Sequence, residues 1–318
     1  MNDYFKLILC LIISFLICFI FCSIHIKKFN LQPKNIVEVT NIKPNHKFKS
    51  LGGIDFIVST LIVFILFNLN NINKSFFVLI FISLYYSLIG LIDDLIKILG
   101  KDSKGLSGYL RIIFEIFGVI ILCNSVSFNL IEFIHFGSNK YLYIGGFAFL
   151  YAIICVLGCC NGVNLTDGLD GLVTITYILA ITPFLYISLL QHNFIISSFL
   201  MCLIGSLLAY LCFNFNPSKL IMGDVGSIPL GALIACISIM LNSEILILVS
   251  GFIYIVEALS VILQVGYFKL TKGKRIFKMA PIHYHFIKCG MKESNVVLLF
   301  TVFGIILSIL ATIIGVII

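Results

Sequence analysis

The sequence predicts an all-α, polytopic transmembrane helix bundle of about ten spans, with both termini on the extracytoplasmic side. Three observations support this fold class: the composition, the spacing of apolar runs and the placement of cationic residues. Of the 318 residues, 60% are hydrophobic and only 11% are charged, which is too little polar surface to cover a soluble globule. We therefore interpret residues 1–318 as a single integral membrane domain whose surroundings are the lipid bilayer.

Apolar runs recur at close to the roughly 20 residues that cross about 30 Å of hydrocarbon. The first run is too long for a signal peptide, and no small-residue cleavage site follows it, so we interpret it as an uncleaved helix. We place the spans at about 5–26, 54–69, 75–92, 110–126, 142–160, 172–190, 194–213, 227–241, 245–268 and 296–317.

Cationic residues collect on one side of this arrangement. With ten alternating spans, the connectors after spans one, three, five, seven and nine share a side. These connectors and their flanks contain all of the 21 Lys and Arg residues except Lys6, Lys74 and Lys140. By the positive-inside rule that side is cytoplasmic. The net charge of +7 is then a topological signal beside anionic lipid, and we predict no nucleic-acid binding.

Cysteine usage does not point to a disulfide framework or a zinc site. The chain has 11 Cys residues, mostly inside apolar runs, and no C-x-x-C pair falls in a connector. We interpret them as small hydrophobic residues.

Four polar clusters fall in the same connectors, which predicts a single polar site at the membrane surface. The first is Asp93 and Asp94, at the end of the third span. Neither carboxylate gains from a helix C-terminus, where the macrodipole favours cations. A magnesium ion, which prefers one or two carboxylates plus substrate phosphates, would compensate them. The alternative is a solvated pair that Lys97 neutralises at i,i+4 from Asp93.

The second cluster runs from Asn161 to Gly171. Asp167 and Asp170 are three residues apart and share a face on a helical turn, and the glycines of this segment permit close approach by a ligand. Together with Asn164 they could bind a planar base or hydroxyl groups. An ordinary loop that caps a helix would use the same residue types.

The third cluster is Gly223 and Asp224, and Asp224 is the only acid between Asp170 and Glu244. It could cap the eighth span, or it could bind a metal while Gly223 lets a diphosphate approach. The sequence leaves both alternatives open.

The fourth cluster contains His283 and His285. Two residues at this spacing point the same way only in an extended backbone. Because Pro281 disfavours helix at Ala280, we expect an extended segment here. Three further acids lie within the spans, where they should face the protein interior or lie near an interface: Asp55, Glu115 and Glu257.

In order and content these motifs resemble the phospho-N-acetylmuramoyl-pentapeptide transferases of the polyprenyl-phosphate sugar-1-phosphate transferase superfamily. The resemblance implies magnesium-dependent transfer of phospho-N-acetylmuramoyl-pentapeptide from its UDP carrier to undecaprenyl phosphate, with release of UMP. The ten-span count also agrees with that family. The matching segments are Gly90–Lys97, Lys104–Leu106, Asn164–Leu172, Met222–Ser227, Glu257–Val265 and Lys274–Phe286.

The resemblance also implies roles for individual residues. Asp224 would bind magnesium, with Asp93 and Asp94 assisting at the metal or deprotonating the lipid phosphate. Of these two, Asp94 is the predicted second ligand. His283 would lie near the diphosphate. The predicted substrate contacts are Asn164, Asp167 and Asp170 around the uridine, together with Gly223, Lys97, Lys104 and His285. The expected partners are a UDP-linked sugar donor and undecaprenyl phosphate, and a homodimer is left open.

Three departures from the family pattern keep other functions open. The segment from His46 to Gly53 lacks the Thr-Pro-Thr that is usual before the second span, the usual triple His is His-Tyr-His at 283–285, and a usual Phe is Ile221. The nearest alternative is a related enzyme that transfers N-acetylglucosamine-1-phosphate for teichoic acid or a surface glycan. A secondary transporter is the alternative from another class, although its site should lie near the bilayer midplane.

Overall fold

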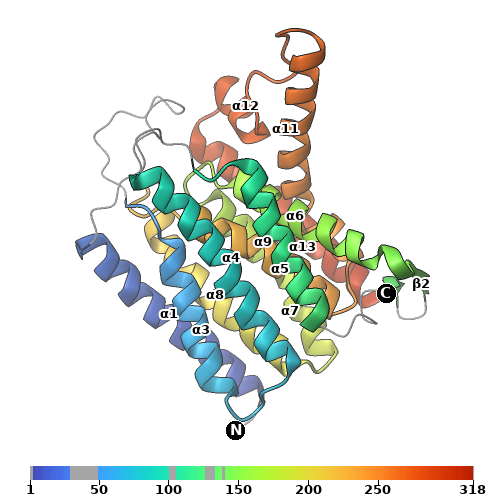
Figure 1. The fold of residues 1–318 in the computed structure, drawn as a ribbon. Helices are drawn as coiled ribbons and strands as arrows, with labels where there is room; N and C mark the ends of the chain where they lie inside the picture. Colours follow the sequence, from blue (N-terminus) through green and yellow to red (C-terminus); the bar gives the residue numbers. More distant parts are fainter. Residues whose placement is uncertain (1–2, 29–48, 100–104, 126–132, 138–139, 318) are drawn as a thin grey trace.

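A computed structural model of the chain describes residues 3–28, 49–99, 105–125, 133–137 and 140–317. The all-α prediction is confirmed apart from one short hairpin (Figure 1). The elements are α1 (Asp3–Lys28), α3 (Gly53–Asn68), α4 (Lys74–Leu99), α5 (Gly108–Ser125), β1 (Phe133–Gly137), β2 (Lys140–Tyr143), the 3-10 helix η2 (Gly145–Phe147), α6 (Ala148–Thr166), α7 (Leu172–Leu190), α8 (Phe194–Asn214), α9 (Asp224–Met240), α10 (Ile245–Ser250), α11 (Phe252–Leu270), α12 (Ile282–Lys288) and α13 (Glu293–Ile317).

The predicted apolar runs coincide with helices of this bundle. Among the described residues, seven helices are long and apolar enough to cross a membrane: α1, α4, α6 with η2, α7, α8, α11 and α13. Two further apolar helices, α3 and α9, are shorter. The chain is therefore a multi-pass membrane protein, whereas the count of ten crossings and the side on which the termini lie stay predictions.

Three local predictions were wrong. The fifth span, expected to begin at residue 142, begins with the 3-10 helix at Gly145 and becomes α-helical at Ala148, because residues 140–143 pair with β1 in an antiparallel hairpin. The ninth span, expected to be continuous from 245 to 268, is divided at Gly251 into α10 and α11. The segment around His283, expected to be extended, is helical in α12 because Pro281 stands at the N-cap position, where a proline precedes the helix without interrupting it.

Helix α9 is the central element of the bundle. Its residues from Val225 to Ile239 are all buried, and α3, α4 and α6 pack around it. A helix that is apolar on every side is stable only when it is surrounded by protein or lipid. Its N-terminus, where Asp224 stands, is thus fixed by packing on several sides.

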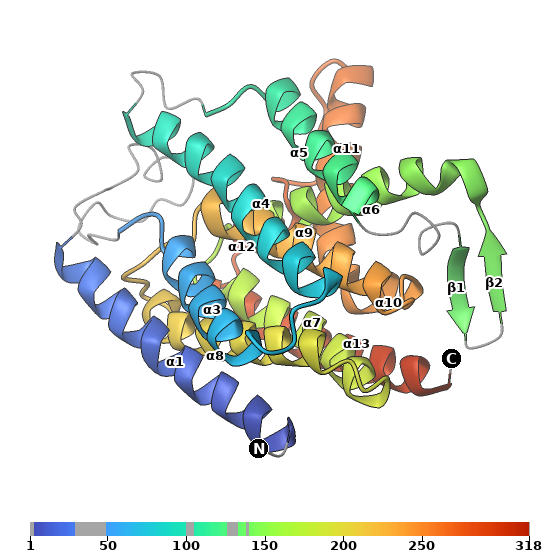
Figure 2. The same cartoon turned by 60° about the horizontal axis from the view of Figure 1, so that its bottom comes forward.

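Helix α8 is also largely buried, and α1, α3 and α7 pack on it (Figure 2). α13 packs on α7. In Figure 1 the C-terminal ends of α4, α6 and α8 lie at the same end of the bundle as α12, and α1 begins at the opposite end. The C-terminal half of α11 extends beyond its neighbours at that same upper end. The described parts of the polar connectors after α4, α6 and α8 therefore lie at one end of the molecule.

Candidate active site

Three carboxylates from two helices meet at this end of the bundle. Asp93 and Asp94 stand near the C-terminus of α4, and Asp224 is the first residue of α9. Each offers an oxygen, and these oxygens all lie within 4.8 Å of one another. We call Asp93, Asp94 and Asp224 the acid group. Asp93 and Asp94 are 3% and 6% exposed, so the acid group is enclosed by protein. The structure thus brings together the acids that the sequence singled out for a metal site.

Two glycines allow the backbones to approach this closely. A Cβ atom at Gly90 of α4 would overlap the carbonyl oxygen of Asp224. Gly223 has a φ of +74° and a Cβ there would stand 2.5 Å from Oδ2 of Asp94. Only glycine adopts that backbone conformation without strain, so Gly223 admits the Asp94 carboxylate to the start of α9.

The N-terminus of α9 is occupied by these acids. The backbone N–H of Val225 donates to Oδ2 of Asp94 at 3.0 Å, which satisfies one of the N–H groups that a helix start leaves without an intrahelical acceptor. Asp224 is the first helical residue and Gly223 is the N-cap, so the capping alternative that the sequence left open does not hold. The carboxylates of Asp94 and Asp224 lie at the N-terminus of α9, where the helix macrodipole favours negative charge.

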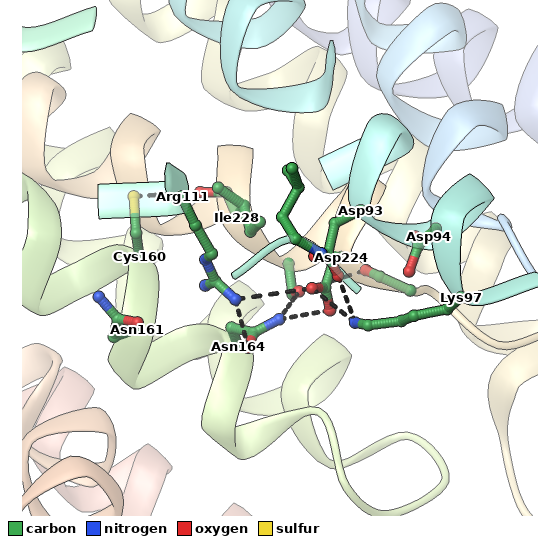
Figure 3. A network of polar contacts seen from close by, with 12 residues as sticks. Asp93, Asp94, Lys97, Arg111, Cys160, Asn161, Asn164, Asp224 and Ile228 are labelled. Atoms are coloured by element: carbon green, nitrogen blue, oxygen red, sulfur yellow. Dashed lines mark hydrogen bonds and ion pairs between the residues drawn. The ribbon is translucent and has the colours of Figure 1, made fainter. Parts of the chain in front are cut away.

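Two cations approach Asp224 from opposite sides (Figure 3). Lys97 forms ion pairs with Asp93 and, at 2.9 Å, with Oδ2 of Asp224. Nη1 of Arg111 on α5 lies 3.6 Å from the same oxygen. The Lys97 pair at i,i+4 from Asp93 is the one expected from the sequence, but Lys97 also reaches the second helix.

Asn164, near the end of α6, holds the other oxygen of Asp224. Its Nδ2 donates to Oδ1 of Asp224 at 2.7 Å and contacts Oγ of Ser227 at 2.9 Å. Its Oδ1 accepts from Nη1 of Arg111 at 3.4 Å. The sequence analysis named Asn164 as a substrate contact, and the structure places it against Asp224 and Arg111.

Arg111 and Ser227 were missed as site residues. Ser227 belongs to the motif that contains Asp224 but was given no role. Arg111 stands four residues before Glu115 within an apolar run, and such a pair of opposite charges in a span would have been a usable signal, because charges in a span need a partner or a cavity.

Asp93 is further fixed by the connector after α4. The backbone N–H of Leu106 donates to Oδ1 of Asp93 at 2.6 Å, and a Cβ at Gly105 would overlap the same carboxylate. The predicted substrate contact Lys104 lies outside the described residues, as does His46 at the start of the divergent segment. The described end of that segment, Lys49 to Gly53, bonds to residues 219–222, directly before Gly223.

Asp167 and Asp170 differ in their surroundings. Burial, reinforced by the charges of Asp224 and Asp94, raises the pKa of Asp167 to about 8, although the N–H of Gly223 partly opposes this. The Asp170 carboxylate accepts from the backbone N–H of Ser218 at 2.8 Å. The backbone N–H of Asp170 donates to Glu293 at 3.1 Å. Asp167 therefore lies within reach of the charges of Asp224 and Asp94, whereas Asp170 ties three connectors together.

Helix α12 separates the two histidines. His283 is fully buried, with Nδ1 3.1 Å from Glu257 Oε2, and its ring lies so near Gly168 that a Cβ there would overlap it. Oη of Tyr284 donates to the Gly168 carbonyl at 3.0 Å. His285 points elsewhere: its Nδ1 accepts from the backbone N–H of Lys278 at 3.1 Å. His283 thus packs on the Asp167 connector, and His285 does not join it.

The acids within the spans face the interior, as expected, and each has a cationic or imidazole partner. Asp55 contacts His25 at 2.8 Å, and Glu115 accepts from Nε of Arg111 at 2.9 Å. Glu257 is the partner of His283. These pairs explain why the chain tolerates carboxylates among apolar helices.

The residues at the acid group fit a divalent cation. Carboxylate oxygens are the ligands that magnesium prefers, and the oxygens around one octahedral magnesium ion lie about 3 to 4 Å apart; the carboxylate oxygens here lie within 4.8 Å of one another. When ionised, Asp93, Asp94, Asp224 and Glu115 carry four negative charges beside two positive ones from Lys97 and Arg111. The acids thus outnumber the cations, and a divalent ion would offset the excess negative charge.

Comparison with known proteins gives consistent matches. The model of glycosyl transferase family 4 matches residues 76–242. The chain is 39% identical over 275 residues to the phospho-N-acetylmuramoyl-pentapeptide-transferase of Staphylococcus carnosus, covering 84% of this chain and 85% of that protein. It is 38% identical over 285 residues to the enzyme of the same name from Clostridium acetobutylicum, covering 84% and 86%. With that of Bacillus mycoides it shares 38% identity over 283 residues, covering 86% of each.

Proposed function

Because the chain belongs to the phospho-N-acetylmuramoyl-pentapeptide-transferases of glycosyl transferase family 4, we propose that it transfers phospho-N-acetylmuramoyl-pentapeptide from a UDP carrier to undecaprenyl phosphate. The products are UMP and the first lipid-linked peptidoglycan precursor. The observation that carries the proposal is the convergence of Asp93, Asp94 and Asp224 beside Lys97 and Arg111.

Phosphoryl transfer asks the protein mainly to position groups and to neutralise charge. Asp224 and Asp94, with Asp93, would hold a magnesium ion, which when bound offsets negative charge on the reacting phosphates. Lys97 and Arg111 supply positive charge from the protein itself. Asn164 fixes the orientation of the Asp224 carboxylate through a 2.7 Å hydrogen bond. Asp93 or Asp94 would accept the proton of the lipid phosphate.

The connector from Asn164 to Asp170 would contact the uridine, and His283 would lie near the diphosphate. Asp167 supports this role because its raised pKa of about 8 keeps its carboxyl largely protonated near neutral pH, and a protonated carboxyl can donate to a carbonyl of the base. Glu257 and Gly168 hold the His283 ring on this connector.

The position of the group at one end of the bundle suits substrates from two phases. A lipid phosphate lies at the level of the headgroups, and a nucleotide sugar arrives from water. The collection of Lys and Arg in the same connectors supports a cytoplasmic site. A transporter is disfavoured, because its site should lie near the midplane and the chain belongs to a transferase family.

The proposal is tested by release of UMP from UDP-N-acetylmuramoyl-pentapeptide, with purified protein, undecaprenyl phosphate and magnesium. Asp224→Asn should lower the rate by about 100-fold or more, as for removal of a group that stabilises transition-state charge. Asp3→Asn is the matched control because Asp3 is exposed in the first turn of α1, and it should keep the wild-type rate. No UMP from a folded wild-type sample would contradict the proposal.

A donor exchange addresses the divergent segment that ends at Gly53. UDP-N-acetylglucosamine should support at most a small fraction of the rate seen with the muramoyl-pentapeptide donor. A preference for UDP-N-acetylglucosamine would show that the donor is the one used by the related glycan enzymes. The proposed phosphoryl-transfer chemistry of the site would not change.

A further inference from the structure

The pair of Arg111 and Glu115 is unusual for two residues at i,i+4 on a helix. Most such pairs lie on the surface and contribute little to stability. Here Glu115 is 0% exposed and the Arg111 side chain is 15% exposed. A buried ion pair often stabilises a fold no better than apolar residues of the same size would. Stability is therefore a poor explanation for keeping these two charges beside the acid group.

Glu115 takes only one edge of the guanidinium group. Its Oε1 accepts from Nε of Arg111 at 2.9 Å. On the opposite edge, Nη1 of Arg111 makes a long contact of 3.4 Å with Asn164 and lies 3.6 Å from Asp224. An arginine facing a carboxylate ordinarily forms two short parallel hydrogen bonds with it. Arg111 does not do this with Asp224, because Glu115 holds its Nε edge and only Nη1 is directed at Asp224.

Two buried atoms of the pair lack a partner within the described part of the chain: Nη2 of Arg111 and Oε2 of Glu115. An unpartnered buried N–H group is costly. Nη2 lies on the same edge of the guanidinium group as Nε, so it faces Glu115. Nη1 lies on the opposite edge and makes only long contacts with Asn164 and Asp224, so Nη1 is the donor available at the acid group. A planar cation with free N–H donors matches a phosphate oxygen well.

We propose that Glu115 is a positioning residue that holds Arg111 by its Nε edge. Arg111 then makes only a long contact with Asp224, which a divalent cation can displace, and it offers Nη1 to a phosphate oxygen of the donor. The part that concerns the phosphate rests on the proposed function. The part that concerns the cation rests on the geometry of the acid group alone, and it can be measured without any donor.

The cation part is tested by titrating Mn2+ into the purified protein without substrate and measuring free Mn2+ by electron paramagnetic resonance. In Glu115→Ala the freed Arg111 should pair with Asp224, and the Mn2+ dissociation constant should rise at least about tenfold, the effect of about 1.4 kcal/mol of competition. Glu115→Gln still accepts from Nε and should stay within about threefold of wild type.

A double variant decides whether Glu115 acts through Arg111. If it does, adding Arg111→Ala to Glu115→Ala should restore Mn2+ affinity to the value of Arg111→Ala alone. The inference would be overturned if the double variant bound Mn2+ as weakly as Glu115→Ala does, or if Glu115→Ala bound Mn2+ with wild-type affinity. Asp55→Asn controls for the loss of a buried ion pair elsewhere, and its Mn2+ affinity should not change.

The phosphate part is read from the kinetics of UMP release. Glu115→Ala should raise KM for the UDP donor by about tenfold, and Glu115→Gln should recover most of this loss. A raised Mn2+ dissociation constant with an unchanged donor KM would remove the phosphate part. If wild-type protein binds Mn2+ and the double variant behaves as expected, yet no UMP forms, then the proposed function fails while the positioning role of Glu115 stands.

Discussion

Asn164 and Asp224, which are 60 residues apart in the chain, are joined by a hydrogen bond of 2.7 Å from Nδ2 to Oδ1. The same amide contacts Ser227, one turn further along α9. This contact ties the end of α6 to the start of the central helix, and it leaves Oδ2 of Asp224 facing Lys97 and Arg111. The orientation of the acid thus depends on a residue outside the acid group.

Asn164→Ala should lower the rate of UMP release by about 10- to 100-fold, the range found when a residue that orients a metal ligand is removed. Ser227→Ala should cost less, because Asn164 keeps its bond to Asp224. The rates of UMP release of the two variants, measured at saturating magnesium, test whether Asn164→Ala loses more activity than Ser227→Ala. Equal losses in the two variants would contradict a direct role for Asn164.

Gly223→Ala should destabilise the protein by about 1 to 3 kcal/mol, since a non-glycine residue would be held at a φ of +74°. It should also abolish UMP release, because the added Cβ would stand 2.5 Å from Oδ2 of Asp94. Gly266→Ala on α11 is the control, since a Cβ added there would meet no neighbouring element within 4 Å. Thermal unfolding in detergent measures the stability of both variants. A Gly223→Ala protein with wild-type stability would contradict this account of the turn.

The raised pKa of Asp167 predicts a pH dependence of stability. Its value of about 8 in the folded protein lies above the ordinary value of about 3.9, so the folded state binds this proton more tightly than the unfolded state. The resulting stabilisation is complete below about pH 4 and is lost as the pH rises through about 8.

Asp167→Asn carries no such proton, and its stability should therefore fall less than that of the wild type as the pH rises from about 5 to about 9. Unfolding temperatures measured in detergent with a metal chelator check this difference. Parallel curves for the two proteins across that range would show that Asp167 ionises normally.

Much of this architecture could be predicted because membrane spans are encoded locally. Runs of apolar residues are sufficient to identify helices such as α7 and α8. The position of Asp93, Asp94 and Asp224 at span ends also follows from the sequence, since charged residues are costly within the hydrocarbon. Their convergence could be expected only in outline, because it depends on how α4 packs against α9 at Gly90.

The parts that were missed depend on contacts between distant segments. The helix that contains His283 follows a proline, and its buried face is set by Glu257 and Gly168, neither of which is near it in sequence. Strand β2 leads directly into the apolar residues of the fifth span, so hydrophobicity alone did not separate strand from helix there. Arg111 was given no role from the sequence, and its position became visible only when α5 was placed beside Asp224.

The central claim, that Asp94 and Asp224 share a divalent cation with Asp93 nearby, is tested most directly by anomalous diffraction from crystals of the protein grown with Mn2+. The account predicts one strong manganese peak bonded to carboxylate oxygens of Asp94 and Asp224, and its loss in Asp224→Asn. A wild-type map with no peak between these side chains, or with the manganese bound by other residues, would contradict it.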